Sequence, residues 1–225
     1  MSVQTPSHPS DAVVYQGQFG EFTINSSDRQ EVILYRTGLM IAALSFAIGS
    51  GLVLWQANYP VVLRALTPLY TVFVAGLALS LLTIHIYMKP LHRALQAFLG
   101  IGAIASLAVA HSSPDPFALT VYQNPITVLG VGFAFAALTG IFFKEAFCFN
   151  RLETKLLTPI VPLLLLGHLF GILPLSAERI LLASWAVLFT VFAFRKAIQA
   201  IPPDIGDKSV FEYLKQQAKT PSNQL

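Results

Sequence analysis

Long apolar runs, separated by short polar segments, occupy most of the chain. Six of these runs approach the roughly 20 residues that a helix needs to cross a bilayer core of about 30 Å. They cover residues 38–55, 68–88, 91–110, 125–147, 159–173 and 177–195. We therefore expect an all-α fold, a polytopic transmembrane helical bundle of about six spans, with residues 37–196 as its membrane domain.

Three of the runs begin with a polar residue followed by proline, a pattern that is typical of helix starts. The pairs are Thr67-Pro68, Asn124-Pro125 and Thr158-Pro159. The polar side chain can cap the helix, and proline in the first turn loses only an N–H that has no helical partner. Before the first run, Ser27 and Gln30 fit a capping box, which predicts a helix start near residue 28.

Short elements are expected toward both ends of the chain. Residues 13–24, VVYQGQFGEFTI, place two glycines between aromatic and β-branched residues, which predicts a small hairpin at the membrane interface. Ser209 and Glu212 fit a second capping box and predict a short amphipathic helix in the tail, which can lie on anionic lipid, dock on a partner or stay solvated. The polar N-terminal segment lacks the basic leader of a cleaved signal peptide, so we expect the first span to remain.

Basic residues alternate between the two sides of the predicted spans. Leaving aside Lys215 and Lys219, which are distant from the spans, one side carries ten of them, whereas the other carries only Arg64 and Arg179. The ten are Arg29, Arg36, Lys89, Arg93, Lys144, Arg151, Lys155, Arg195, Lys196 and Lys208. Under the positive-inside rule this pattern predicts that both termini are cytoplasmic, with residues 1–36 and 197–225 as cytoplasmic segments.

Composition supports a lipid environment and weakens other classes of function. Hydrophobic residues make up 55% of the chain, charged residues 11%, and the mean hydropathy is +0.65, values that are atypical of a water-soluble domain. Membrane topology explains the net charge of +3, so no nucleic-acid partner is expected. Cys148 is the single cysteine, and no ligand motif or long extramembrane segment indicates a metal, a cofactor or a catalytic domain.

Small residues recur at every fourth position in four of the runs. The stripes are Ala43, Ala47 and Gly51; Gly102, Ser106 and Ala110; Gly132, Ala136 and Gly140; and Gly167 with Gly171. Such stripes let helix backbones approach closely in lipid, where hydrophobicity alone does not drive association. They predict a compact bundle and also suit contact with a membrane-protein partner or a second copy of the chain.

Four polar side chains are expected at similar depth near the cytoplasmic edge: His85, His92, Glu145 and Cys148. Imidazole, carboxylate and thiol groups can together bind a transition metal. Their spacing matches no established ligand motif, and Lys144 disfavours a cation, so interfacial hydrogen bonding is the favoured interpretation. Among histidine pairs, only His85 and His92 lie at one depth, as the axial ligands of a haem must.

His168 is the strongest single candidate for a functional residue. If its helix begins at Thr158, His168 lies roughly 15 Å along it, near the bilayer centre, where ionisable groups are costly and often functional. The favoured interpretation is instead a neutral imidazole that hydrogen-bonds across a tight helix crossing at Gly167 and Gly171.

These observations favour a non-enzymatic bundle that assembles or stabilises a larger membrane complex. A small-solute carrier is the alternative, because ALTPLYTV from residue 65 and LLTPIVPL from residue 156 open corresponding spans of two inverted halves. A metal- or tetrapyrrole-binding membrane enzyme is a weaker alternative, because no convincing ligand set is present.

Three segments, VVYQGQFGEFTI, TIHIYMKPLH and FFKEAFCF, occur in this order along the six-span chain. They resemble a family of uncharacterised integral membrane proteins of cyanobacteria and plastid-bearing organisms, and the resemblance covers most of the chain. It implies a bacterial plasma membrane or a thylakoid membrane as the location. It implies no activity for any residue.

Overall fold

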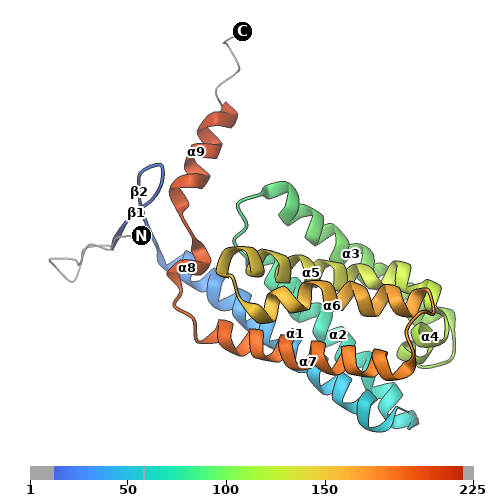
Figure 1. The fold of residues 1–225 in the computed structure, drawn as a ribbon. Helices are drawn as coiled ribbons and strands as arrows, with labels where there is room; N and C mark the ends of the chain where they lie inside the picture. Colours follow the sequence, from blue (N-terminus) through green and yellow to red (C-terminus); the bar gives the residue numbers. More distant parts are fainter. Residues whose placement is uncertain (1–12, 58, 220–225) are drawn as a thin grey trace.

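Six long helices form the body of the molecule (Figure 1). The computed structural model describes residues 13–57 and 59–219. The long helices are α1 (Ser26–Gln56), α2 (Pro60–Thr83), α3 (Lys89–Ser112), α5 (Val128–Phe149), α6 (Leu152–Leu169) and α7 (Leu175–Ala197). Within the described residues these six helices are long and apolar enough to cross a membrane, α5 being extended by the 3-10 turn η1 (Pro125–Thr127). The predicted six-span, all-α bundle is therefore confirmed.

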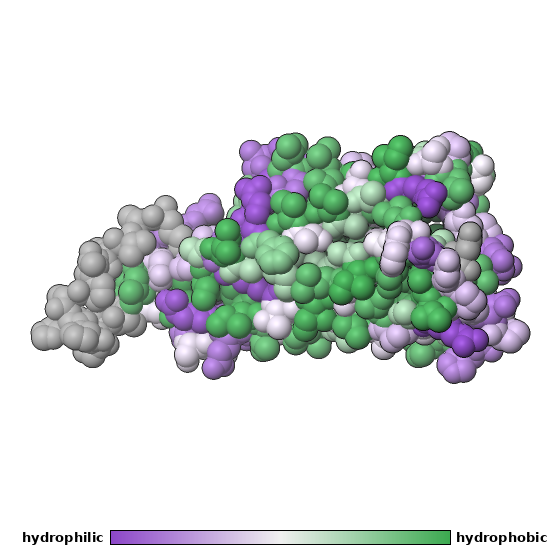
Figure 2. Space-filling model, turned by 90° about the horizontal axis from the view of Figure 1, so that it is seen from below, coloured by the Kyte–Doolittle hydropathy of each residue, from purple (hydrophilic) through white to green (hydrophobic). Residues whose placement is uncertain are grey.

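The surface of the bundle has an apolar middle. Figure 2 shows hydrophobic side chains over most of one face, with hydrophilic side chains gathered toward its two ends. Individual apolar side chains such as Leu82, Ile104 and Val187 are 62–70% exposed. A continuous apolar surface of this kind is unfavourable in water and suits direct contact with lipid.

Smaller elements lie at both ends of the bundle. At one end the strands β1 (Val14–Gln16) and β2 (Glu21–Thr23) pair antiparallel beside α8 (Pro202–Ile205) and α9 (Lys208–Lys219). The predicted hairpin and the predicted tail helix are therefore both present. The other end carries α4 (Phe117–Gln123), which lies between α3 and η1 in the chain. We call these two ends the hairpin end and the α4 end.

The first long helix begins with a capping box formed by Asn25 and Asp28. The N–H of Asp28 donates to Asn25 Oδ1, and the N–H of Asn25 donates to Asp28 Oδ2, both at 2.8 Å. The predicted box of Ser27 and Gln30 is wrong, because both residues already lie inside α1. The predicted boundary between the N-terminal segment and the membrane domain, after residue 36, therefore falls inside α1. The outermost parts of the predicted cytoplasmic segments, 1–36 and 197–225, lie outside the described residues.

Two of the three predicted proline starts are wrong. Helix α2 begins at Pro60 and α6 begins at Leu152, so Pro68 and Pro159 lie about two turns inside their helices. Each internal proline removes one backbone hydrogen bond, and the residues before it extend the helix and offset that loss. The third start is confirmed, because η1 begins at Pro125.

An aromatic cluster fills the middle of the bundle. Phe46 of α1, Phe73 of α2, Phe135 of α5 and Trp185 of α7 form five ring pairs with centroids 4.4–6.5 Å apart. Around this cluster, α1 packs mainly on α2 and α7, whereas α5 packs mainly on α3 and α6. Aromatic side chains therefore occupy the region near the midplane where carriers bind their solutes.

Close helix approaches depend on small residues, in part at the predicted positions. A Cβ at Gly38 of α1 would lie 2.5 Å from the carbonyl oxygen of Gly76 in α2. A Cβ at Gly102 of α3 would collide with the backbone of Ala134 in α5, which confirms close packing at that predicted stripe. In contrast, a Cβ built at Gly51 would meet no described atom of another helix within 4 Å, so this last position of its stripe makes no close approach, whereas Ala43 of the same stripe is buried.

Candidate functional site

Charged side chains from four helices meet inside the hairpin end, and we call them the ion cluster. They are Arg36 of α1, Lys144 and Glu145 of α5, Lys196 of α7, and Asp204 of α8. Lys196 Nζ lies 2.5 Å from Glu145 Oε2 and also forms an ion pair with Asp204. Arg36 Nη2 lies 2.6 Å from Asp204 Oδ2, and Lys144 Nζ lies 2.9 Å from Glu145 Oε1. The cluster thus joins segments that are far apart in the sequence.

The centre of the ion cluster is closed to solvent. Glu145 and Lys196 are each 0% exposed, and Asp204 is 5% exposed. Aromatic rings line the cluster, since the Tyr35 hydroxyl donates to Glu145 Oε1 at 3.1 Å and Lys196 Nζ lies 3.9 Å from the centre of the Phe149 ring. In such surroundings water screens the charges little, so ion pairing is stronger than at a surface.

Every carboxylate oxygen of the ion cluster has at least one polar partner. The partners are Tyr35, Lys144 and Lys196 for Glu145, and Arg36, Lys196 and Gln199 for Asp204. A buried ion pair is tolerated when its members are fully paired, and removal of one member leaves an uncompensated buried charge. The arrangement therefore suits a structural clamp, because each buried charge depends on the others for its compensation.

Arg36 also holds the start of the tail. Its Nη1 donates to the carbonyl oxygen of Gln199 at 2.6 Å, and its Nη2 donates to the carbonyl oxygen of Ala200 at 2.9 Å. These carbonyls follow the end of α7, where the backbone acceptors have no further helical donors. Arg36 thus fastens the segment between α7 and α8 against α1.

The hairpin, α8 and α9 form an additional layer at this end, which we call the end layer. The N–H of Gln18 donates to Asp207 Oδ2 at 2.6 Å, and the N–H of Phe19 donates to Ser209 Oγ at 3.0 Å. The Phe19 ring stacks on Tyr213 with centroids 4.0 Å apart. These contacts join the two ends of the described chain.

Asp207 caps α9. The N–H of Ser209 donates to Asp207 Oδ1 at 2.9 Å, so the predicted pairing of Ser209 with Glu212 at the helix start is wrong. Partial burial raises the pKa of Asp207, but hydrogen bonds from Ser209 and from the Gln18 N–H outweigh this effect and lower the pKa below its ordinary value of 3.8. The ionised carboxylate is therefore the form that holds the hairpin against α9.

The four side chains predicted at the cytoplasmic edge do not converge on one site. Glu145 belongs to the ion cluster, whereas Cys148 is exposed. His85 Nε2 lies 3.2 Å from Glu31 Oε2, and His92 Nε2 lies 2.6 Å from a carbonyl oxygen in the last turn of α2. Across residues 13–57 and 59–219, no three His, Cys, Asp or Glu side chains are grouped so that they can hold a metal ion.

His168 lies at the α4 end, and its predicted position at the bilayer centre is wrong. Because α6 begins at Leu152, His168 falls in the last turn of this helix. Its Nδ1 lies 2.8 Å from Glu178 Oε1, and its Nε2 lies 3.2 Å from the carbonyl oxygen of Tyr122, whose ring stacks on the imidazole. Both ring nitrogens face acceptors, so only the protonated ring can donate to both at once.

The predicted helix crossing at Gly167 and Gly171 is also wrong. Gly171 follows α6 with a φ of +63°, and no described atom lies within 4 Å of a Cβ built on it. The N–H of Ile172 donates to the carbonyl oxygen of Gly167 at 3.0 Å, as expected for a helix that ends in a Schellman turn. The two glycines therefore shape the end of α6 and do not form a contact between helices.

Lys196 and Asp204 of the ion cluster are the functional candidates that sequence reasoning missed. In the sequence, Lys196 is one of several basic residues that indicate the cytoplasmic side of the spans. Asp204 follows two prolines in a segment that has the composition of a loop, so the sequence does not indicate that it is buried. One local signal was available, because Glu145 stands inside the aromatic segment FFKEAFCF, where an unpaired carboxylate would be costly. Its donors Tyr35 and Lys196 lie 110 and 51 residues away, so no local pattern identifies them.

Comparison with known proteins places the chain among integral membrane proteins. Residues 79–213 match the family described as "Uncharacterized integral membrane protein (DUF2301)". An uncharacterised protein of Haemophilus influenzae is 31% identical over 185 residues, which cover 82% of this chain and 92% of that protein. This organism is neither a cyanobacterium nor plastid-bearing, so the expected restriction of the family is not confirmed. No solved structure matches the chain.

Proposed function

The chain belongs to the DUF2301 family of integral membrane proteins, and we propose that it is a non-enzymatic bundle that assembles or stabilises a larger membrane complex. This role requires a rigid membrane body and a surface that a partner can recognise. The aromatic core supports the first requirement, because its side chains fill the midplane. The end layer supports the second.

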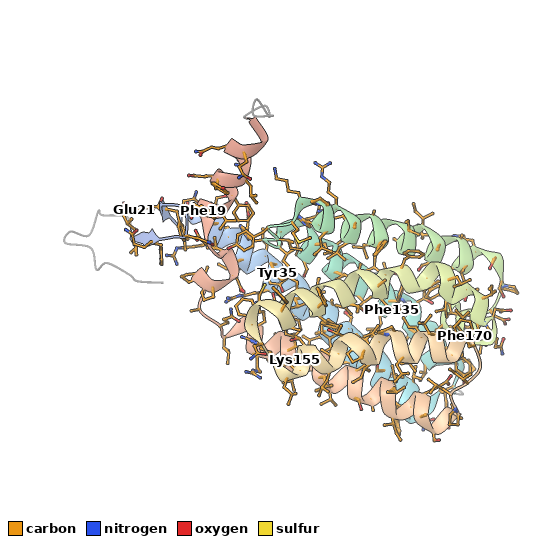
Figure 3. The ribbon with its side chains drawn as sticks, turned by 45° about the horizontal axis from the view of Figure 1, so that its top comes forward. Phe19, Glu21, Tyr35, Phe135, Lys155 and Phe170 are labelled. Atoms are coloured by element: carbon orange, nitrogen blue, oxygen red, sulfur yellow. The ribbon has the colours of Figure 1, made fainter. Side chains whose placement is uncertain are left out.

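The observation that carries the proposal is the exposure of aromatic rings on the end layer. Phe19 is 44% exposed, although its N–H donates to Ser209 Oγ. Tyr213 is 36% exposed, although it stands inside helix α9. Exposed aromatic side chains on an ordered backbone are typical of protein–protein interfaces. Figure 3 shows Phe19 at this end of the molecule and Phe170 at the opposite end.

A small-solute carrier is the second candidate, and the arrangement of the helices favours it. Helix α1 packs on α2 and α7, and α5 packs on α6 and α3, which is the pattern expected of two inverted halves with three helices each. Pro68 and Pro159 also occupy similar positions in the corresponding helices α2 and α6. The filled aromatic centre supports the assembly role over transport.

The proposal includes an orientation, with the hairpin end in the cytoplasm of a bacterial plasma membrane or on the equivalent side of a thylakoid membrane. The distribution of basic residues near the spans supports this orientation. Ten lie on the hairpin side, and only Arg64 and Arg179 lie on the other side. A reporter fused after residue 220 is expected on the cytoplasmic side, and one inserted near residue 115 on the opposite side. The reverse result would overturn the orientation.

Partner recovery tests the assembly role. The chain is purified in mild detergent from its native membrane, and the proteins that remain bound are identified by mass spectrometry. Phe19→Ala is expected to reduce partner recovery several-fold, whereas the matched variant Phe170→Ala, which removes an exposed ring at the α4 end, is expected to leave it unchanged. Equal recovery with both variants would remove the end layer as the partner surface. Solute uptake by the purified chain in proteoliposomes would favour the carrier.

A further inference from the structure

Helix α9 has two faces that contact different parts of the molecule. On one face, Tyr213 stacks on Phe19 of the hairpin, with centroids 4.0 Å apart. Phe211 stands two positions earlier and therefore on the opposite face, where it packs on Tyr87 with centroids 4.7 Å apart. Tyr87 lies in the short segment that joins α2 to α3.

The face of α9 that bears Phe211 continues past the edge of the bundle. Leu214 lies one turn beyond Phe211 on this face and is 45% exposed. Figures 1 and 3 show that α9 runs roughly perpendicular to the bundle helices and extends beyond them. Since the bundle helices cross the bilayer, a helix in this direction runs along the bilayer surface.

The charges near Leu214 indicate what covers the face of α9 that bears Phe211 and Leu214. Lys215 follows Leu214 and is exposed, and Lys89 and Arg93 at the start of α3 are exposed at the same end. Met88 beside them is 62% exposed. Exposed cations next to exposed apolar side chains match the anionic headgroups and acyl chains of a bilayer surface. A second copy of the chain on this face would instead bring like charges together.

We propose that the Leu214 face of α9 lies on the bilayer surface at the hairpin end and binds anionic phospholipid headgroups. Leu214 enters the boundary between headgroups and acyl chains, and Lys215 contacts the headgroup phosphates. This surface is separate from the proposed partner surface, because the exposed rings of Phe19 and Tyr213 lie on the other face of α9.

Site-directed spin labels on the full chain test this placement. In a Cys148→Ser background, which removes the single cysteine, a label at Leu214→Cys is compared with a control label at Gln216→Cys, two positions further on. In nanodiscs that contain anionic phospholipid, we expect the label at 214 to be accessible to oxygen and protected from a water-soluble nickel reagent. The label at 216 is expected to show the reverse. Equal accessibility of the two labels would overturn the proposal.

Two further changes test whether anionic headgroups bind this face: removal of anionic lipid from the nanodisc, and reversal of the charge of Lys215. We expect the protection of the 214 label to fall several-fold in purely zwitterionic nanodiscs, and also when Lys215→Glu is added to the labelled chain. Glu212→Gln, on another side of α9, is expected to leave the protection unchanged. Protection that is equal in both lipids would overturn the role of anionic headgroups. Dipolar coupling between labels on two chains would show that a second copy covers this face and would overturn the lipid assignment.

Discussion

The two ends of the bundle use ion pairs in different surroundings. At the hairpin end, Glu145 and Lys196 are 0% exposed and every carboxylate oxygen of the ion cluster has a partner. At the α4 end, the side chains of His168 and Glu178 remain 18% and 14% exposed, and an open hollow of about 400 Å³ lies between the starts of α2 and α4. Water can replace a lost partner at the α4 end but not in the ion cluster. The same kind of interaction therefore has a small effect on stability at one end and a large effect at the other.

The largest effect is expected from a change within the ion cluster. Glu145→Ala leaves Lys196 with a single carboxylate and removes the acceptor of Tyr35 and Lys144. We expect this substitution to lower the free energy of unfolding by about 3–5 kcal/mol, because it leaves buried positive charge uncompensated. Unfolding of the purified protein in mild detergent measures the loss.

A double variant keeps this prediction testable if the single variant does not fold. Glu145→Met combined with Lys196→Met removes one charge of each sign, and we expect it to be more stable than either single variant. A Glu145→Ala protein that is as stable as the unmodified chain would show that the ion cluster does not hold the hairpin end together.

A backbone effect of intermediate size is expected at the end of α6. Gly171→Leu is expected to cost about 1–2 kcal/mol of stability, because a residue with a side chain is strained at a φ of +63°. Gly51→Leu is the matched control, since no described atom is near a Cβ at that position and the backbone there is helical. Equal stability losses in the same unfolding assay would show that the backbone conformation is not the cause.

A smaller effect is expected at the partly exposed pair of the α4 end. His168→Gln keeps one hydrogen-bond donor and is expected to cost about 0.2–1 kcal/mol, less than Glu145→Ala and less than Gly171→Leu. The same unfolding assay gives the order of the three variants. If His168→Gln abolishes solute uptake while the fold stays intact, the carrier hypothesis moves ahead of the assembly role.

The smallest effect is a dependence of stability on pH through His85. Burial lowers the pKa of His85 below its ordinary value of 6.5, and the nearby charges of Glu31 and Asp28 offset only part of this shift. Just below pH 6.5 the unfolded chain therefore binds a proton that the folded chain resists, so stability decreases as the pH falls through this window. His85→Gln should flatten unfolding profiles measured between about pH 5 and about pH 7. A profile that His85→Gln leaves unchanged would assign the dependence to another group.

Local patterns in the sequence were sufficient to predict most of the fold. An apolar run of about 20 residues can satisfy its backbone in lipid only as a helix, so the spans follow from the sequence one by one. The hairpin in residues 13–24 and the helix start at Pro125 are equally local features. The predicted helix starts at Pro68 and Pro159 are wrong, because both helices begin about two turns earlier. The free energy lost with one backbone hydrogen bond at proline is smaller than the free energy gained by extending a helix that is already formed.

The sequence by itself determined which segments enter the membrane, because lipid acts on each segment separately. Only the tertiary structure decided how the buried charges are paired. Glu145 meets Lys196 and Tyr35 because α5, α7 and α1 are neighbours at the hairpin end. No local pattern in the sequence predicts which helices will be neighbours. His168 was misplaced for a related reason, since its depth depends on where α6 begins and ends, and contacts with Glu178 and Tyr122 hold it at the α4 end.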